Sequence, residues 1–173
     1  MSISFYEASV LSYLQTLAAV QGYLGKGLAH CKEKSVDPEE IVEARIYPDM
    51  LPFRFQIHSV VHHSLGAIEG FKSGVFRPPG EKPKHSYAEL QTHVAEALDT
   101  IRKLTPAEID VLEGNDLIFE IRNTKMPFTA KDFFFSFSLP NFHFHATTAY
   151  DILRTKGVPL GKRDYMGALR LKA

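Results

Sequence analysis

Hydrophobic positions near the start of the chain repeat with the spacing of an amphipathic helix. From Phe5 to about Lys32 they recur three to seven residues apart, at Val10, Leu14, Leu17, Leu24 and Leu28. A similar pattern returns farther along, at Met50, Phe53, Ile57, Val60, Val61, Ser64, Ile68 and Phe71. Because about 3.6 residues make one helical turn, each pattern places its apolar side chains on one face. We therefore predict two long helices, and Pro48 and Pro52 limit where the second can begin.

Capping signals predict two further long helices. Ser86 and Glu89 form a capping box, in which each side chain accepts a hydrogen bond from a backbone amide of the first turn, and a helix over about 87–104 follows. The last long helix is predicted over about 130–156 and ends before a glycine. Pro140 lies inside it and should kink its axis, because proline lacks the amide proton for one ladder hydrogen bond.

Shorter elements connect the helices. The segment 74–83 holds several prolines and glycines and is predicted to be a loop. Residues 117–122 and 126–128 flank the tripeptide 123–125, which is typical of a small hairpin. The tail, 158–173, is rich in polar residues and is expected to pack as an extended strap. Four long amphipathic helices indicate an all-α protein, a four-helix bundle with a small hairpin before the last helix.

Composition narrows the possible functions. A chain of 173 residues with 45% hydrophobic content suits one domain over 1–173. Twenty basic and twenty acidic residues are mixed along it, which argues against nucleic acid or an anionic membrane surface as a partner. Cys31 is the single cysteine, so an intrachain disulfide is excluded and a reducing compartment is favoured. With no basic start and no apolar run of about 20 residues, we expect a cytoplasmic protein outside the membrane.

The last helix carries a candidate polar face. Asn141 and His145 are four residues apart and therefore nearly align, whereas His143 is turned toward the opposite side. Asn141 has a purely structural alternative, which is to satisfy the backbone carbonyl that Pro140 leaves without a donor. An unsatisfied buried polar group costs about 1–3 kcal/mol, so some partner is required in either case.

The second helix carries further histidines. His58 and His62 are four residues apart and can lie on one side, while His63 is turned by about another 100°. His62 and His145 could hold a divalent ion together with a third group, either Asn141 or His58, and a water. Such a site would be catalytic, because structural zinc usually has four protein ligands. An amide oxygen is a poor ligand for borderline metals, so His58 would give the tighter site.

Each of these histidines also has a plain structural interpretation. A histidine on a helix is most often a surface residue or a hydrogen-bonded core residue. The aromatic run over 133–137 can fill the core or form the wall of a pocket. His30, His85 and His93 are interpreted as ordinary surface positions.

Four segments resemble a family described as a domain of unknown function, within the DinB-like superfamily, also called DinB and YfiT. They are PDMLPF at 48–53, LPNF followed by FH at 139–145, TTAY at 147–150 and GVPLGKRD at 157–164. The resemblance spans nearly the whole chain. It implies an up-down-down-up four-helix bundle, often a dimer, with a metal site between helices two and four. Metal-binding members use one histidine of the second helix and two of the last; His62 and His145 match two of them, and Asn141 stands at the third.

Residues and resemblance together lead to two functional hypotheses. The first is a metal-assisted transferase or isomerase that uses Zn²⁺ or Ni²⁺ and acts on a small molecule between helices two and four. The alternative is a non-catalytic small-ligand-binding or dimerisation bundle that has lost its ion. In both cases a small molecule and a second copy of the chain are the expected partners.

Overall fold

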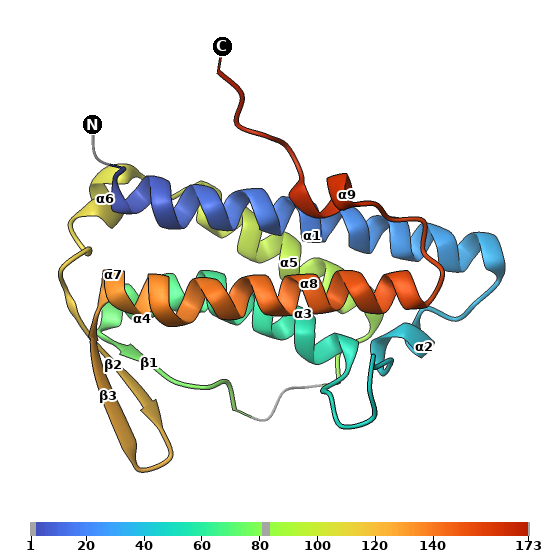
Figure 1. The fold of residues 1–173 in the computed structure, drawn as a ribbon, viewed down its shortest axis with the longest axis horizontal. Helices are drawn as coiled ribbons and strands as arrows, with labels where there is room; N and C mark the ends of the chain where they lie inside the picture. Colours follow the sequence, from blue (N-terminus) through green and yellow to red (C-terminus); the bar gives the residue numbers. More distant parts are fainter. Residues whose placement is uncertain (1–2, 81–83, 173) are drawn as a thin grey trace.

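Long helical segments lie side by side and form the body of the structure, a computed structural model that describes residues 3–80 and 84–172 (Figure 1). The long segments are α1 (Phe5–Lys34); α3 (Phe53–Val61) continued by the π-helical turn η1 (His62–Gly66) and α4 (Ala67–Ser73); α5 (Tyr87–Arg102); and α7 (Ala130–Phe133) continued by the π-helical turn η2 (Phe134–Ser138) and α8 (Leu139–Thr155). The short helices are α2 (Glu39–Val42), α6 (Pro106–Asp110) and α9 (Lys162–Met166).

The helix starts follow from their capping residues. The hydroxyls of Ser4 and Ser86 each accept a hydrogen bond from the amide three residues on, and the glutamate at that position accepts one from the backbone amide of the serine. These reciprocal bonds satisfy amides that have no partner inside the helix. The second segment begins at Phe53, later than the apolar stripe indicates, because Pro52 stands at the N-cap with extended backbone. The predicted extents of α1 and α5 are confirmed to within two residues at each end.

Buried tyrosines tie α1 to its neighbours. Tyr13, Tyr23 and Tyr87 are at most 1% exposed. The Tyr23 hydroxyl donates to the Ala146 carbonyl on α8 at 3.0 Å, and the Tyr87 hydroxyl donates to the Leu24 carbonyl at 2.9 Å. A tyrosine hydroxyl can be buried at little cost only when it is hydrogen-bonded, as these are. The predicted stripe of α1 is buried at most of its positions, although its last member, Leu28, is 38% exposed.

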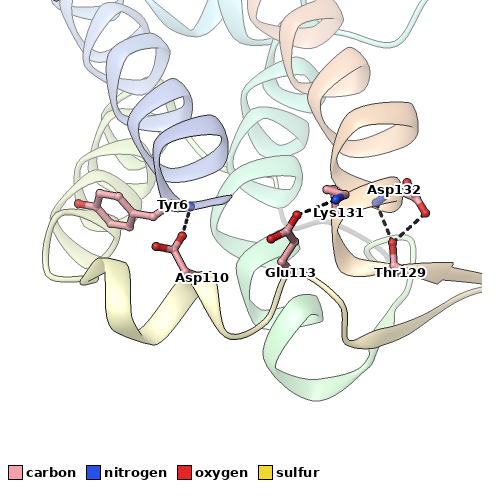
Figure 2. Close-up of polar contacts among 6 residues, drawn as sticks. All are labelled: Tyr6, Asp110, Glu113, Thr129, Lys131 and Asp132. Atoms are coloured by element: carbon pink, nitrogen blue, oxygen red, sulfur yellow. Dashed lines mark hydrogen bonds and ion pairs between the residues drawn. The ribbon is translucent and has the colours of Figure 1, made fainter. Parts of the chain in front are cut away.

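Polar contacts close one end of the helical body (Figure 2). The Tyr6 amide donates to Asp110 Oδ1 at 2.7 Å, which joins the start of α1 to the end of α6. Lys131 Nζ lies 2.6 Å from Glu113 Oε1, and the Thr129 hydroxyl caps the start of α7. These contacts fix where the last helical segment begins relative to α1.

A small sheet makes the all-α prediction wrong in detail, although the structure is mostly helical. The sheet has the order β1 (Val75–Phe76), β2 (Asp116–Ile121) and β3 (Thr124–Thr129). β2 and β3 form the predicted hairpin, with its turn at Arg122–Asn123. β1 lies in the segment 74–83, which is predicted to be a loop, and it pairs with β2 in parallel. Two residues cannot display an alternating pattern, and their partners lie 43 residues away in sequence, so local patterning misses them.

The last helical segment has a wide turn just before Pro140, the residue that is predicted to kink it. The π-helical turn η2 ends at Ser138, two residues before Pro140. A proline ring clashes with the carbonyl four residues earlier, and a wider turn is one way for a helix to bypass that contact. The segment then continues as α8 to Thr155, close to its predicted end. A second π-helical turn, η1, interrupts the second long segment, where the sequence pattern predicts a plain helix.

The C-terminal segment is only partly the extended strap that the sequence predicts. It contains α9, which packs on α1 through a contact of Lys26 Nζ with Asp164 Oδ1 at 2.5 Å. Beyond α9 the chain runs away from the helices as an irregular segment (Figure 1). Residues 81–83 of the predicted loop and residue 173 of the strap lie outside the described residues.

Within residues 3–80 and 84–172, no helix has both the length and the apolar character needed to cross a bilayer.

Candidate functional site

The two π-helical turns are joined by a buried chain of hydroxyl groups. Ser138, in η2, donates to the His63 carbonyl in η1 at 2.7 Å, and its oxygen lies 2.9 Å from the Tyr13 hydroxyl. Because the serine proton is used on the carbonyl, Tyr13 must be the donor of the second bond. Both hydroxyls are fully buried. The chain therefore sets the position of the backbone that carries His62 and His63.

Gly66 leaves space for the ring of His62. A Cβ atom at position 66 would lie 3.1 Å from His62 Nδ1 and 3.7 Å from two ring carbons. Phe76, in β1, covers the ring from another side, with the two ring centroids 4.4 Å apart. His62 is thus packed between its own helix and the small sheet.

His62, His63 and His145 line one cavity of about 210 Å³, which we call the aromatic cavity. Phe55, Phe76 and Phe137 supply much of the remaining wall. The rings of His63 and His145 lie nearly parallel, with centroids 5.8 Å apart and planes at 13°. Three imidazoles from two helical segments therefore meet beside apolar rings.

The tautomer of His145 is determined by Gln56, a residue that is only 2% exposed. The Gln56 side-chain nitrogen donates to the Leu51 carbonyl at 2.8 Å, which turns its oxygen toward His145 Nδ1, also at 2.8 Å. An amide oxygen only accepts hydrogen bonds, so Nδ1 carries the proton. In the neutral imidazole, Nε2 then bears the lone pair. That lone pair can accept a proton or bind a metal ion.

A second cavity of about 490 Å³ lies on the other side of His62, and we call it the histidine cavity. His58, His85 and His93 line it together, with ring centroids 4.8, 5.3 and 6.0 Å apart. His58 is 4% exposed, and the other two are half-buried. The interpretation of His85 and His93 as ordinary surface positions is therefore wrong.

Comparisons with known proteins place the chain in a family. The profile of the family described as "Domain of unknown function (DUF1993)" matches residues 5–166. The chain belongs to this family. A DinB family member protein from Shewanella denitrificans, whose crystal structure was determined at 1.83 Å resolution, has a TM-score of 0.81 and 24% sequence identity; the match covers 97% of this chain and 94% of that one. No protein among the curated ones matches the sequence.

The family match confirms the resemblance to a domain-of-unknown-function family. At 24% identity, the structural similarity establishes a shared fold. The DUF1993 chain is thus mostly helical with a small sheet, and it shares the fold of that DinB family member.

The predicted metal ligands of the DUF1993 chain fall into different places. His62 and His145 line the aromatic cavity together. His58 lies in the histidine cavity, which it shares with His62. Asn141 is directed at its own helix, where its side-chain nitrogen donates to the Phe137 carbonyl at 2.7 Å. Asn141 thus satisfies a backbone carbonyl, as in the structural alternative, but that carbonyl belongs to Phe137 and not to Ser136, which lies four residues before Pro140.

A divalent ion at His62 and His145 therefore lacks the third ligand that the sequence proposes. A catalytic zinc site has three protein ligands. Among the described residues, no group of three His, Cys, Asp or Glu side chains could hold a metal ion. The ion stays a prediction, and we derive no chemical step through it.

His143 and His63 show what helical spacing can and cannot predict in the DUF1993 chain. His143 points away from the aromatic cavity, as predicted, and contacts the Tyr165 hydroxyl at 3.2 Å. Burial lowers the pKa of His143. His63, by contrast, is missed as a partner of His145, because the π-helical turn changes the rotation per residue exactly where the chain meets the last helix.

Proposed function

We propose that this DUF1993 protein binds a small molecule in the aromatic cavity and that His145 accepts a proton from it. The proton moves from the ligand to His145 Nε2, and its electron pair stays on the ligand. This is the opening step of an isomerase, which returns the proton to another atom, or of a transferase that activates a thiol. The observation that carries the proposal is the Leu51–Gln56–His145 hydrogen-bond chain.

The size and walls of the cavity support a small, partly planar ligand. Its volume of about 210 Å³ is below the range of roughly 300–1,000 Å³ found for drug-sized ligands. Phe137 and Phe76 offer apolar ring surfaces, while His62 and His63 add polar atoms. Planar compounds with one acidic hydrogen match this combination.

The second candidate is a ligand-binding module without chemistry. It is favoured by the close packing of the histidine rings, because His62 lies against Phe76 and His63 against both Phe76 and Phe137. Rings held in this way can serve as walls and hydrogen-bonding groups alone. The same cavity would then select a ligand without transforming it.

A screen by ligand-observed NMR separates the two candidates. Planar carboxylic acids and thiols are tested for binding, and bound compounds are then incubated in D₂O to follow exchange of their acidic C–H hydrogens. The proposal expects binders whose exchange is lost in His145→Ala and retained in His143→Ala. The control lies on the same helix and contacts Tyr165 instead of the cavity.

Binding that His145→Ala weakens, with no exchange catalysed by the wild-type protein, supports the non-catalytic module. Binding and exchange that do not respond to His145→Ala refute the assignment of this cavity. Far-ultraviolet circular dichroism of both variants shows that the comparison is made between folded proteins.

A further inference from the structure

We propose that the Ser59 hydroxyl donates a hydrogen bond to a carbonyl oxygen of the ligand in the aromatic cavity, so that the ligand is a small carbonyl compound with a hydrogen on the neighbouring carbon. This inference rests on the proposed role of His145, and it adds the class of ligand and a second group that contacts it. Ser59 lies on α3, is 3% exposed and lines the cavity. Apart from the imidazoles, it is the one polar side chain among the described residues that line this cavity.

The Ser59 side chain differs from the other buried serines in its hydrogen bonds. Within residues 3–80 and 84–172, the buried serines are Ser9, Ser59, Ser64 and Ser138. Ser9 and Ser64 each donate to the carbonyl four residues earlier, at 2.6 and 2.8 Å, and Ser138 donates to the His63 carbonyl. The Ser59 hydroxyl makes no hydrogen bond to the described part of the chain. A buried hydroxyl needs a partner, and one in the wall of a cavity obtains it from what fills the cavity.

Three neighbours of Ser59 on its own helical segment contact His145. Gln56, three residues earlier, accepts the hydrogen bond from Nδ1, and Phe55, four residues earlier, packs edge-on against the ring. His63, four residues later, lies nearly parallel to it. Residues three and four apart share a helix face, with their Cβ atoms about 5–6 Å apart. Ser59 therefore belongs to the face of this segment that meets His145.

Removal of a proton next to a carbonyl group needs a base and a hydrogen-bond donor together. When His145 Nε2 takes the proton, the electron pair of the C–H bond forms the carbon–carbon double bond of an enolate, and the π pair of the carbonyl group moves to its oxygen. A negative oxygen in an apolar cavity is stable only beside a donor. The Ser59 hydroxyl can be that donor, because its proton is not used on a protein carbonyl. Return of the proton from His145 to the oxygen or to a conjugated carbon completes an isomerisation.

1-Indanone and indane test the carbonyl contact, because the two planar molecules differ only in that group. In ligand-observed NMR, Ser59→Ala should weaken binding of 1-indanone about 2–10-fold, the loss expected for one neutral hydrogen bond, and leave binding of indane unchanged. Exchange of the hydrogens next to the carbonyl in D₂O should slow by about 10²–10³-fold in kcat, because the oxygen carries more charge in the transition state. Ser59→Thr keeps a hydroxyl and should exchange 1-indanone faster than Ser59→Ala does.

Stability without ligand distinguishes a contact with the ligand from a structural role. Ser59→Ala removes a hydroxyl that has no partner in the described chain, so the melting temperature should stay the same or rise. The matched control Ser9→Ala removes a hydroxyl that is bonded to the Phe5 carbonyl. Its melting temperature should fall, while its exchange of 1-indanone should equal that of the wild-type protein. Loss of exchange without loss of stability is typical of a residue that serves function.

Four results would overturn the role of Ser59. They are wild-type protein that does not exchange 1-indanone, wild-type exchange rates in Ser59→Ala, equal weakening of 1-indanone and indane binding by Ser59→Ala, and a melting temperature of Ser59→Ala that falls as far as that of Ser9→Ala. The role of His145 is tested separately, by His145→Ala. If that substitution abolishes exchange of the carboxylic acid or thiol probes and 1-indanone is not exchanged, the carbonyl class alone is wrong.

Discussion

Replacing Ser138 by alanine should destabilise the protein more than any single hydrogen bond would suggest. Ser138 donates to the His63 carbonyl at 2.7 Å and accepts from the Tyr13 hydroxyl at about 2.9 Å, and all of these atoms lie in the interior. Ser138→Ala removes both bonds and leaves a buried acceptor and a buried donor. Each such group costs about 1–3 kcal/mol, so we expect the free energy of unfolding to fall by about 2–6 kcal/mol.

Tyr13→Phe gives this prediction its sharpest form. In the wild-type background it removes one hydrogen bond and should cost about 1 kcal/mol. In the Ser138→Ala background the Tyr13 hydroxyl is already unsatisfied, so the same change should stabilise the protein. The change in the free energy of unfolding caused by Tyr13→Phe should therefore have opposite signs in the two backgrounds.

Urea unfolding followed by circular dichroism provides all four free energies of this cycle. Tyr13→Phe that destabilises both backgrounds equally would refute the shared chain. A loss below about 0.5 kcal/mol in Ser138→Ala would refute it as well, because that is the range of ordinary surface changes.

Four further predictions follow from the surroundings of single residues. Gly22→Ala, with nothing within 4 Å of the new Cβ, should raise the free energy of unfolding by roughly 0.5–1 kcal/mol. Gly66→Ala should not raise the free energy of unfolding, because its Cβ would lie 3.1 Å from Nδ1 of the His62 ring, and it should weaken ligand binding in the aromatic cavity. An equal increase in the free energy of unfolding for Gly66→Ala and Gly22→Ala, measured in urea, would contradict this. Burial lowers the pKa of His143 in the folded protein, so as the pH falls the unfolded chain binds a proton at this histidine before the folded protein does. The free energy of unfolding should therefore decrease as the pH drops below about 6.5. The melting temperature of His143→Gln should decrease less over the same pH range. Gln56→Leu removes the acceptor for the Nδ1–H of His145 on α8. The imidazole ¹⁵N shifts of His145 should then report a mixture of tautomers. An unchanged spectrum would show that another group holds the proton on Nδ1.

Helix positions could be predicted because their signals are local. The capping box at Ser86 and Glu89 and the apolar stripe of α1 each involve residues within one or two turns, and the structure has both helices within two residues of their expected limits. The hairpin β2–β3 is local in the same sense. β1 is different, because a strand of two residues exists only through its parallel partner in β2.

The relative directions of some histidines could be predicted for the same reason. Helical spacing correctly separates His145 from His143, since both lie on one helix of regular geometry beyond Pro140. It assigns His58 and His62 to one side, and both do line the histidine cavity. It could not bring His85 and His93 to His58, because that meeting depends on how α5 packs against α3.

The sequence by itself determined the helical class, the ends of α1 and α5, and the family, since turn periodicity, capping and family motifs are written in neighbouring residues. Tertiary structure decided which imidazoles share a cavity, which tautomer His145 adopts and where the chain departs from α-helical geometry. Those outcomes depend on contacts between residues as much as 89 positions apart, such as Gln56 and His145. Packing of separate helices creates such contacts, and no local pattern records them.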